Sequence, residues 1–194
     1  PLKQDAVYNG DRGPGNDIYY KASNVLHTLR TLIGDEAFFK ITRIAVYGRD
    51  DPKPGNFAPR YLGTRDFVKI VNQVTGKDFG WFFDVYLYDA VAPELVEARE
   101  DGDLVLSWKT SGDKPFPMPV DVKIGDRIVT LPMTGGTGRV TVGEAAPVIV
   151  DPASKILRRQ PYVEAYQAWR AAADKAAAEA RKKAADDKAA ADKK

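Results

Sequence analysis

The residues with the clearest chemical potential stand together near the start of the chain, in the segment Asp17-Ile18-Tyr19-Tyr20-Lys21. Behind them, apolar residues recur at the spacing of one buried helix face: Ala22, Val25, Leu26, Leu29 and Ile33. This spacing predicts a helix over about 18–33 that Asp17 caps. Tyr19 would lie at the positive end of that helix, near the ammonium of Lys21, where a phenol can donate to a developing oxyanion. The alternative is an aromatic side chain that only packs at the helix start.

The sequence offers no complete catalytic constellation. It has one histidine, His27, and no cysteine, which excludes a two-histidine metal site, a thiolate zinc site and a cysteine nucleophile. His27 follows Tyr19 by eight residues, so the two could share a side of the helix, but no acid or nucleophile is spaced to complete a triad. The carboxylates Asp35-Glu36 and Asp50-Asp51 stand at expected caps and loops, where solvent and the helix dipole account for them.

Three more helices are predicted before residue 92. Gly34 is placed to end the opening helix. Asp35 is expected to cap the second helix, which runs to about Tyr47. Thr64 is expected to cap the third, which ends at Thr75-Gly76, and Asp78 is expected to cap a short fourth helix. The last of these carries the stripe Phe79, Phe82, Phe83, Tyr86 and Leu87, which indicates core packing rather than a ligand site.

From Ala92-Pro93 onward the apolar period changes from about 3.6 residues to 2. Alternating residues indicate five or more short strands, at 104–108, 120–124, 129–133, 140–142 and 148–150. With Gly, Asp or Pro in the turns, this pattern predicts a small antiparallel β-sandwich over about 93–151. The glycine-rich stretch 134–138 lacks the following helix and the Lys-Ser/Thr pair of a phosphate loop, so we interpret it as a hairpin turn.

The chain is expected to turn helical again from Lys155, with Pro161 in the first turn or at a break. Leu157, Tyr162, Tyr166 and Trp169 would anchor one stripe. No large apolar residue follows Trp169. The remaining Ala, Lys, Arg, Asp and Glu residues predict a solvated, solubilising helix with little to bury.

Charge and hydropathy restrict the possible partners. The net charge of +2 arises after residue 160, where eight Lys/Arg face six Asp/Glu, so residues 1–160 balance at zero. A basic footprint for nucleic acid is therefore absent from the body of the chain, and no run approaches the roughly 18 apolar residues of a membrane span. The chain begins at Pro1, so we expect a piece of a longer protein. Its compartment stays open between cytoplasm and periplasm or secretion.

Residues 19–38, from Tyr19-Tyr20-Lys21-Ala22 onward, resemble the Tyr-x-Lys/Arg-Gly segment of the aminopeptidase N-type zinc metallopeptidases, or gluzincins. The similarity continues in order through residues 64–67, 75–83, 116–122 and 150–152, and so covers about 8–157. The resemblance implies an α+β chain. Residues 1–92 would be the helical C-terminal half of a thermolysin-like catalytic domain, 93–156 the family's β-sandwich, and 157–194 an Ala/Lys-rich helical tail.

In that family the motif tyrosine donates to the oxyanion of the tetrahedral intermediate, and the matching residue here is Tyr19. The sequence departs from the family at Ala22, where the motif has glycine, at Tyr86, where tryptophan is usual, and at Val91-Ala92-Pro93, where Gly-x-Pro is expected. These departures indicate a divergent branch.

The family's H-E-x-x-H motif and third glutamate ligand are absent from this chain. The resemblance therefore implies that zinc belongs to a parent enzyme whose ligands lie outside this chain, and that this segment binds none and is inactive alone. Its expected partners are the N-terminal catalytic half and, in the intact enzyme, a peptide substrate. The alternative function is a non-catalytic binding or scaffolding module derived from a peptidase fold.

Overall fold

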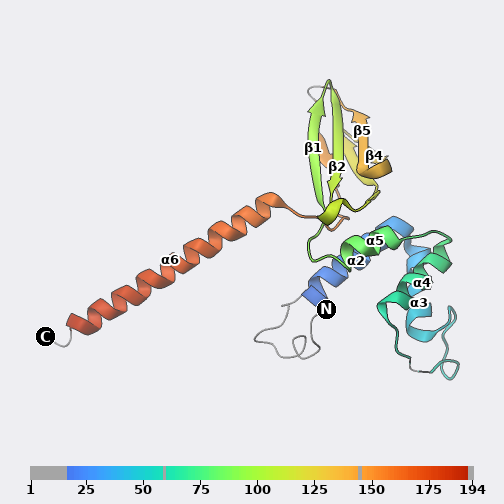
Figure 1. Cartoon of the computed structure of the whole chain (residues 1–194), viewed down its shortest axis with the longest axis horizontal. Helices are drawn as coiled ribbons and strands as arrows, with labels where there is room; N and C mark the ends of the chain where they lie inside the picture. Colours follow the sequence, from blue (N-terminus) through green and yellow to red (C-terminus); the bar gives the residue numbers. More distant parts are fainter. Residues whose placement is uncertain (1–16, 59, 144–145, 192–194) are drawn as a thin grey trace. The chain divides into compact units, whose positions relative to one another are not determined.

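The structure is a computed structural model that describes residues 17–58, 60–143 and 146–191. It divides into two units, residues 1–158 and residues 159–194. Within the described part, the first unit joins short helices to two small antiparallel sheets, and the second is one long helix (Figure 1). This arrangement confirms the predicted α+β class with its small sheets and C-terminal helix.

The first two helices are α2 (Asp17–Ile33) and α3 (Asp35–Tyr47), with Gly34 alone between them. Gly34 has a φ of 82°, a conformation that glycine adopts without steric cost. It is the N-cap of α3, and its N–H donates to the Arg30 carbonyl at 2.8 Å. The prediction that Asp35 caps α3 is wrong, because the Asp35 carboxylate instead accepts two hydrogen bonds from the Arg30 guanidinium.

The next two helices are α4 (Thr64–Thr75) and α5 (Gly80–Tyr86). Thr64 was expected as the cap of α4, but the N-cap is Gly63, whose N–H donates to the Asp66 carboxylate at 3.3 Å. The predicted end of α4 is confirmed, since Gly76 has a left-handed conformation. The N-cap of α5 is Phe79 rather than the predicted Asp78, although the Asp78 carboxylate accepts the Gly80 N–H at 2.8 Å from one position upstream.

The aromatic stripe of α5 lies in the core, as predicted. Phe79, Phe82, Phe83 and Tyr86 are buried, whereas Leu87, at the end of the helix, is 41% exposed. The stripe continues into the sandwich, because the Tyr86 ring lies 5.5 Å from the ring of Phe116, which is also buried. Helices and strands therefore share one core.

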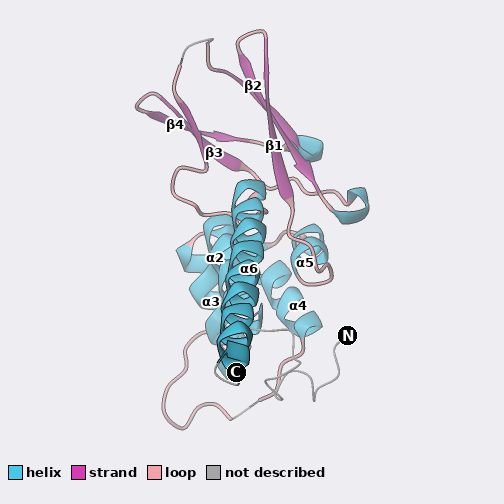
Figure 2. Ribbon diagram, turned by 90° about the vertical axis from the view of Figure 1, so that its left-hand side faces the viewer, coloured by secondary structure: helices cyan, strands magenta, loops and turns pink. Residues whose placement is uncertain are grey.

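The sandwich consists of two three-stranded antiparallel sheets, whose strands are magenta in Figure 2. One sheet has the order β1 (Glu94–Glu100), β2 (Asp103–Lys109), β5 (Thr137–Thr141). The other has the order β4 (Arg127–Leu131), β3 (Val120–Ile124), β6 (Val148–Val150). The buried alternating residues that revealed these strands in the sequence, such as Leu104, Leu106, Val120 and Val122, contribute to the core.

Two features of the sandwich differ from expectation. Strand β1 was not predicted, because only Leu95 among its seven residues is fully buried and the others give no apolar alternation. The glycine-rich stretch is not a hairpin turn, because β4 and β5 belong to different sheets. A short 3₁₀ turn, η2 (Thr134–Gly136), connects them.

After β6 the chain returns to the helices through residues 151–157, which we call the return segment. The buried Asp151 carboxylate accepts the backbone N–H groups of Lys155 and Ile156 at 2.8 and 3.1 Å. The Leu157 N–H donates to the Thr28 hydroxyl of α2 at 2.9 Å, and the Leu157 carbonyl accepts from the Tyr86 hydroxyl of α5 at 2.7 Å. The predicted helix from Lys155 does not form there, since these side chains engage the backbone groups that a helix would use.

The second unit contains α6 (Pro161–Ala191), a 31-residue helix. Pro161 is its first residue, in the first turn as predicted, where a missing N–H costs nothing. Tyr162, Tyr166 and Trp169 are 72%, 54% and 65% exposed, so they do not anchor the helix within its own unit. In the described residues no helix is both long and apolar enough to cross a membrane.

Candidate functional site

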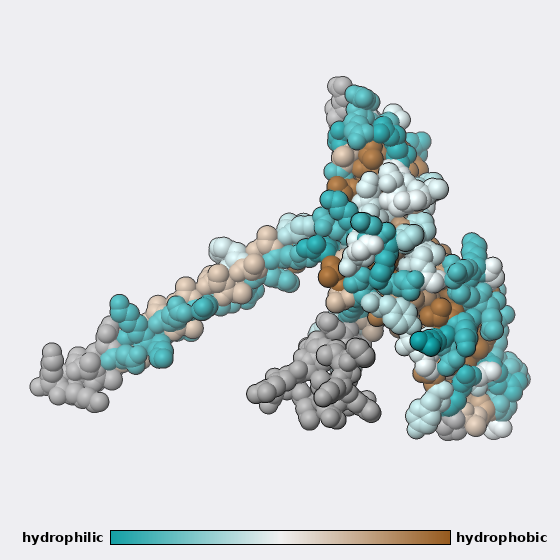
Figure 3. Space-filling model, in the orientation of Figure 1, coloured by the Kyte–Doolittle hydropathy of each residue, from teal (hydrophilic) through white to brown (hydrophobic). Residues whose placement is uncertain are grey.

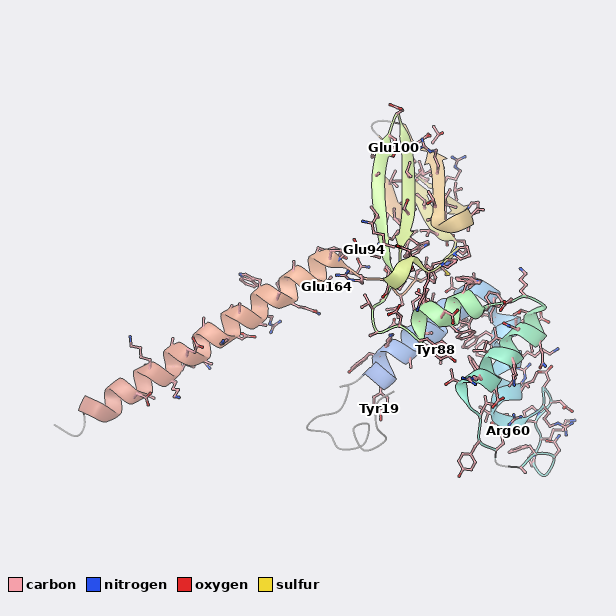
Figure 4. The ribbon with its side chains drawn as sticks, viewed as in Figure 1. Tyr19, Arg60, Tyr88, Glu94, Glu100 and Glu164 are labelled. Atoms are coloured by element: carbon pink, nitrogen blue, oxygen red, sulfur yellow. The ribbon has the colours of Figure 1, made fainter. Side chains whose placement is uncertain are left out.

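Tyr19 lies in the first turn of α2 and projects into solvent. Its side chain is 68% exposed, and that of Tyr20 beside it is 67% exposed. Figure 4 shows the labelled Tyr19 at the N-terminal end of α2 and Tyr88 beyond the end of α5. Because Val25 and Leu29 on the same helix are buried, the helix is fixed by its inner face while Tyr19 stays accessible.

Lys21 has a different role from the one its position in the sequence indicated. Its ammonium donates to the Asp89 carbonyl at 2.8 Å. Residues two apart on a helix do not face each other, so Lys21 does not place its charge against Tyr19. It instead attaches the first turn of α2 to the connection between α5 and β1.

The same connection is held from the sandwich side. The Lys114 ammonium lies 3.2 Å from the Asp89 carboxylate and 3.3 Å from the Asp84 carbonyl. Its hydrogen bond to Asp89 is the main reason that the pKa of this carboxyl lies below its usual range. A chain of polar contacts thus runs from the sandwich through Asp89 to the turn that carries Tyr19. Neither Lys114 nor Asp89 stood out in the sequence, because the two are 25 residues apart.

An apolar groove opens along α2 behind Tyr19. It has a volume of about 280 Å³ and is formed by residues of α2, α5 and the start of α4: Ala22, Val25, Leu26, Leu62, Gly63, Thr64, Phe67, Phe83 and Leu87. Leu26 and Leu87 on its border are 39% and 41% exposed. Hydrophobic residues reach the surface over this helical part in Figure 3. Exposed apolar surface of this kind marks places where further protein or a ligand packs.

The remaining expected groups do not complete a reactive site with Tyr19. His27 is exposed on α2. Within the described residues no three His, Asp or Glu side chains come together in a way that could hold a metal ion. The groups present in this part of the chain therefore do not fit a zinc site, and no catalytic step through zinc follows from its geometry.

A separate cavity of about 320 Å³ lies between α2 and the sandwich and is lined largely by polar groups. The sequence analysis did not predict it. Asp121 in its wall accepts hydrogen bonds from the Thr130 hydroxyl at 2.7 Å and the Lys155 ammonium at 3.2 Å. These contacts, that of Thr130 first, lower the pKa of Asp121. Since Asp151 in the same wall caps the return segment, both carboxylates have partners inside the protein. An Asp-Pro pair after a strand is a turn signal in the sequence, and it could have pointed to Asp151.

Comparison with protein families and with curated proteins finds no match. Among solved structures, the chain is similar to the crystal structure of Legionella pneumophila aminopeptidase A in complex with aspartic acid. The TM-score is 0.49 and the sequence identity is 15%, over 71% of this chain and 17% of that one. The chain thus spans about one sixth of the length of that aminopeptidase.

Proposed function

We propose that this chain is the C-terminal segment of a zinc-dependent aminopeptidase of the gluzincin type and that Tyr19 stabilises the oxyanion during peptide hydrolysis. The observation that carries the proposal is that Tyr19, in the motif Tyr19-Tyr20-Lys21, is exposed on a helical turn that other contacts hold in place. The phenol is exposed at a helix N-terminus, and Lys21 and the buried face of α2 hold that turn in place. A fixed donor of this kind can stabilise a charge that develops opposite it.

One further feature supports the proposal. In it the zinc ligands and the general base would come from the N-terminal catalytic half, because this chain lacks the H-E-x-x-H motif. The apolar groove along α2 offers that half a surface on which to pack, close to Tyr19. The peptide substrate would then bind between the two halves, and the segment alone would be inactive.

The test is Tyr19→Phe in the protein that contains both this segment and a zinc motif. Loss of one oxyanion donor typically lowers kcat by about 10²–10³-fold, and zinc content measured by atomic absorption should stay unchanged. Tyr20→Phe is the matched control, because this neighbour is equally exposed and lies on a different side of the helix. A Tyr19→Phe enzyme with the kcat of the wild type would refute the proposed role.

The second candidate is a non-catalytic binding module, which the groove also favours. In that case the groove holds a partner protein, and Tyr19 contributes only to its rim. The sequence upstream of residue 1 distinguishes the two functions: an H-E-x-x-H motif with a distant glutamate supports the enzyme, and an unrelated domain supports the module. Zinc analysis and an aminoacyl-anilide assay on this segment should both be negative under either function, so activity there would contradict both.

A further inference from the structure

The first turn of α2 carries Tyr19 but contributes little to the core. Tyr19 and Tyr20 are exposed, as are Ser23 and Asn24, and among the described side chains of α2 the first buried one is Val25. The first N–H groups of a helix have no partner within it, and terminal turns open at little cost in free energy. A turn of this kind needs contacts from other parts of the protein if its residues are to keep one position.

Asp89 provides such a contact. Its backbone carbonyl accepts a hydrogen bond from the Lys21 ammonium at 2.8 Å, across 68 residues of sequence. Figure 4 shows Tyr88, the residue before Asp89, near the end of α2 that carries Tyr19. Because Lys21 extends from the first turns of the same helix, this bond attaches the backbone that carries Tyr19 to the connection between α5 and β1.

Asp89 is also held from the sandwich side. Its carboxylate lies 3.2 Å from the Lys114 ammonium, which also donates to the Asp84 carbonyl at 3.3 Å. The Asp89 side chain is 15% exposed, and a partly buried ion pair is screened by salt much less than one in open solvent. One residue therefore joins two lysines, with its carbonyl on the first and its carboxylate on the second.

We infer that Asp89 is a positioning residue for Tyr19: together with Lys21 and Lys114 it places the first turn of α2 and thereby sets the rate of peptide hydrolysis. This inference rests on the proposed function, because the place of the turn affects a rate only if Tyr19 acts on the substrate. A displacement of about 1 Å can cost about a hundredfold in rate. Loss of these contacts should therefore lower kcat and change KM little.

The experiment uses the protein that contains both this segment and a zinc motif. Lys21→Met removes the ammonium and keeps a long side chain that suits a helix. We expect kcat for an aminoacyl-anilide to fall about 10–100-fold, with KM changed less than about threefold and zinc content unchanged. Lys21→Arg keeps a donor and should recover most of the rate. Asp89→Asn breaks the ion pair with Lys114 but keeps the carbonyl, and should lower kcat by a smaller factor.

The ion pair of Lys155 and Asp121 offers a matched control, since its distance of 3.2 Å equals that of Lys114 and Asp89. Lys155→Met and Lys114→Met each remove one partly buried contact, so both should lower Tm by similar amounts in thermal unfolding. Lys114→Met should also lower kcat, whereas Lys155→Met should not. An equal fall of kcat in the two variants would mean that lost stability alone slows the enzyme, and would overturn the inference.

A double-mutant cycle tests whether Lys21 acts through Tyr19. In the Tyr19→Phe background, Lys21→Met should lower kcat less than about twofold, because the donor that the turn positions is already gone. An equal loss in both backgrounds would overturn the inference, as would a Lys21→Met enzyme with the kcat of the wild type. In both cases a low kcat of Tyr19→Phe alone would still support the proposed function. A Tyr19→Phe enzyme with the kcat of the wild type would refute the function and the inference together.

Discussion

The hydroxyl of Thr28 should be a large single contributor to the stability of the first unit, and Thr28→Val tests this. Thr28 is fully buried, and its oxygen accepts the Leu157 N–H at 2.9 Å. Valine keeps the shape of the side chain but leaves that N–H without a partner. An unsatisfied buried donor costs about 1–3 kcal/mol. For a unit of this size each kcal/mol lowers Tm by about 2–4 °C, so a loss of 2 kcal/mol corresponds to about 4–8 °C.

Calorimetry of wild type and variant at pH 7 measures the difference directly. The matched control is Thr42→Val, because the Thr42 hydroxyl donates to the Phe39 carbonyl at an exposed site and should cost less than about 0.5 kcal/mol. Tyr86→Phe removes the second contact to Leu157 and permits a double-mutant cycle with Thr28→Val. We expect a coupling of about 0.5–3 kcal/mol, since both side chains hold one residue. A Thr28→Val variant as stable as the wild type would refute the view that the return segment is anchored through Leu157.

Two other predictions concern the sandwich and its contact with the helices. A Cβ on Gly138 would lie 2.7–2.9 Å from atoms of residues 131–133, so Gly138→Ala should destabilise the first unit by about 1–3 kcal/mol in urea unfolding. Because Lys114 holds the pKa of Asp89 low, the ionised carboxylate stabilises the folded state at pH values above its unfolded pKa of about 4, and this contribution is lost as the pH falls through the folded value. Asp89→Asn should therefore be less stable than wild type at pH 6, and the two Tm values should converge as the pH falls below about 4. A constant difference over that range would contradict the role of this ion pair.

Much of the fold could be predicted from local patterns. The apolar spacing of α2 and the aromatic stripe of α5 identified buried faces, and the change of period near residue 92 identified the sandwich. The helix starts at Asp35 and Thr64 were misassigned by one residue, because glycine precedes each and supplies the cap through its backbone. Strand β1 was not predicted, because its sequence has no regular alternation of apolar and polar residues and only Leu95 is buried.

The candidate site shows where sequence reasoning ends. Tyr19 could be proposed as a candidate from its neighbours in the chain, but the groups that fix its helix come from far away. Asp89 is 68 residues from Lys21, and Leu157 is 129 residues from Thr28. No periodicity relates such positions, and the folded backbone alone brings them together. The interpretation of residues 134–138 as a hairpin turn failed for a similar reason, since a local turn signal does not show which sheet the next strand joins.

These distant contacts connect α2, the helix that carries Tyr19, to the β-sandwich within one unit. The first turn of α2 is attached through Lys21 to Asp89, which Lys114 of the sandwich side also binds. Two turns further on, Thr28 binds the return segment, which the sandwich positions through Asp151. The helix is thus held at two points along its length by groups that the strands place. The proposed role of Tyr19 as a donor requires such support, because a displacement of about 1 Å can cost a hundredfold in rate. The sandwich therefore supports α2 at these two points, and with it the backbone that carries the exposed Tyr19.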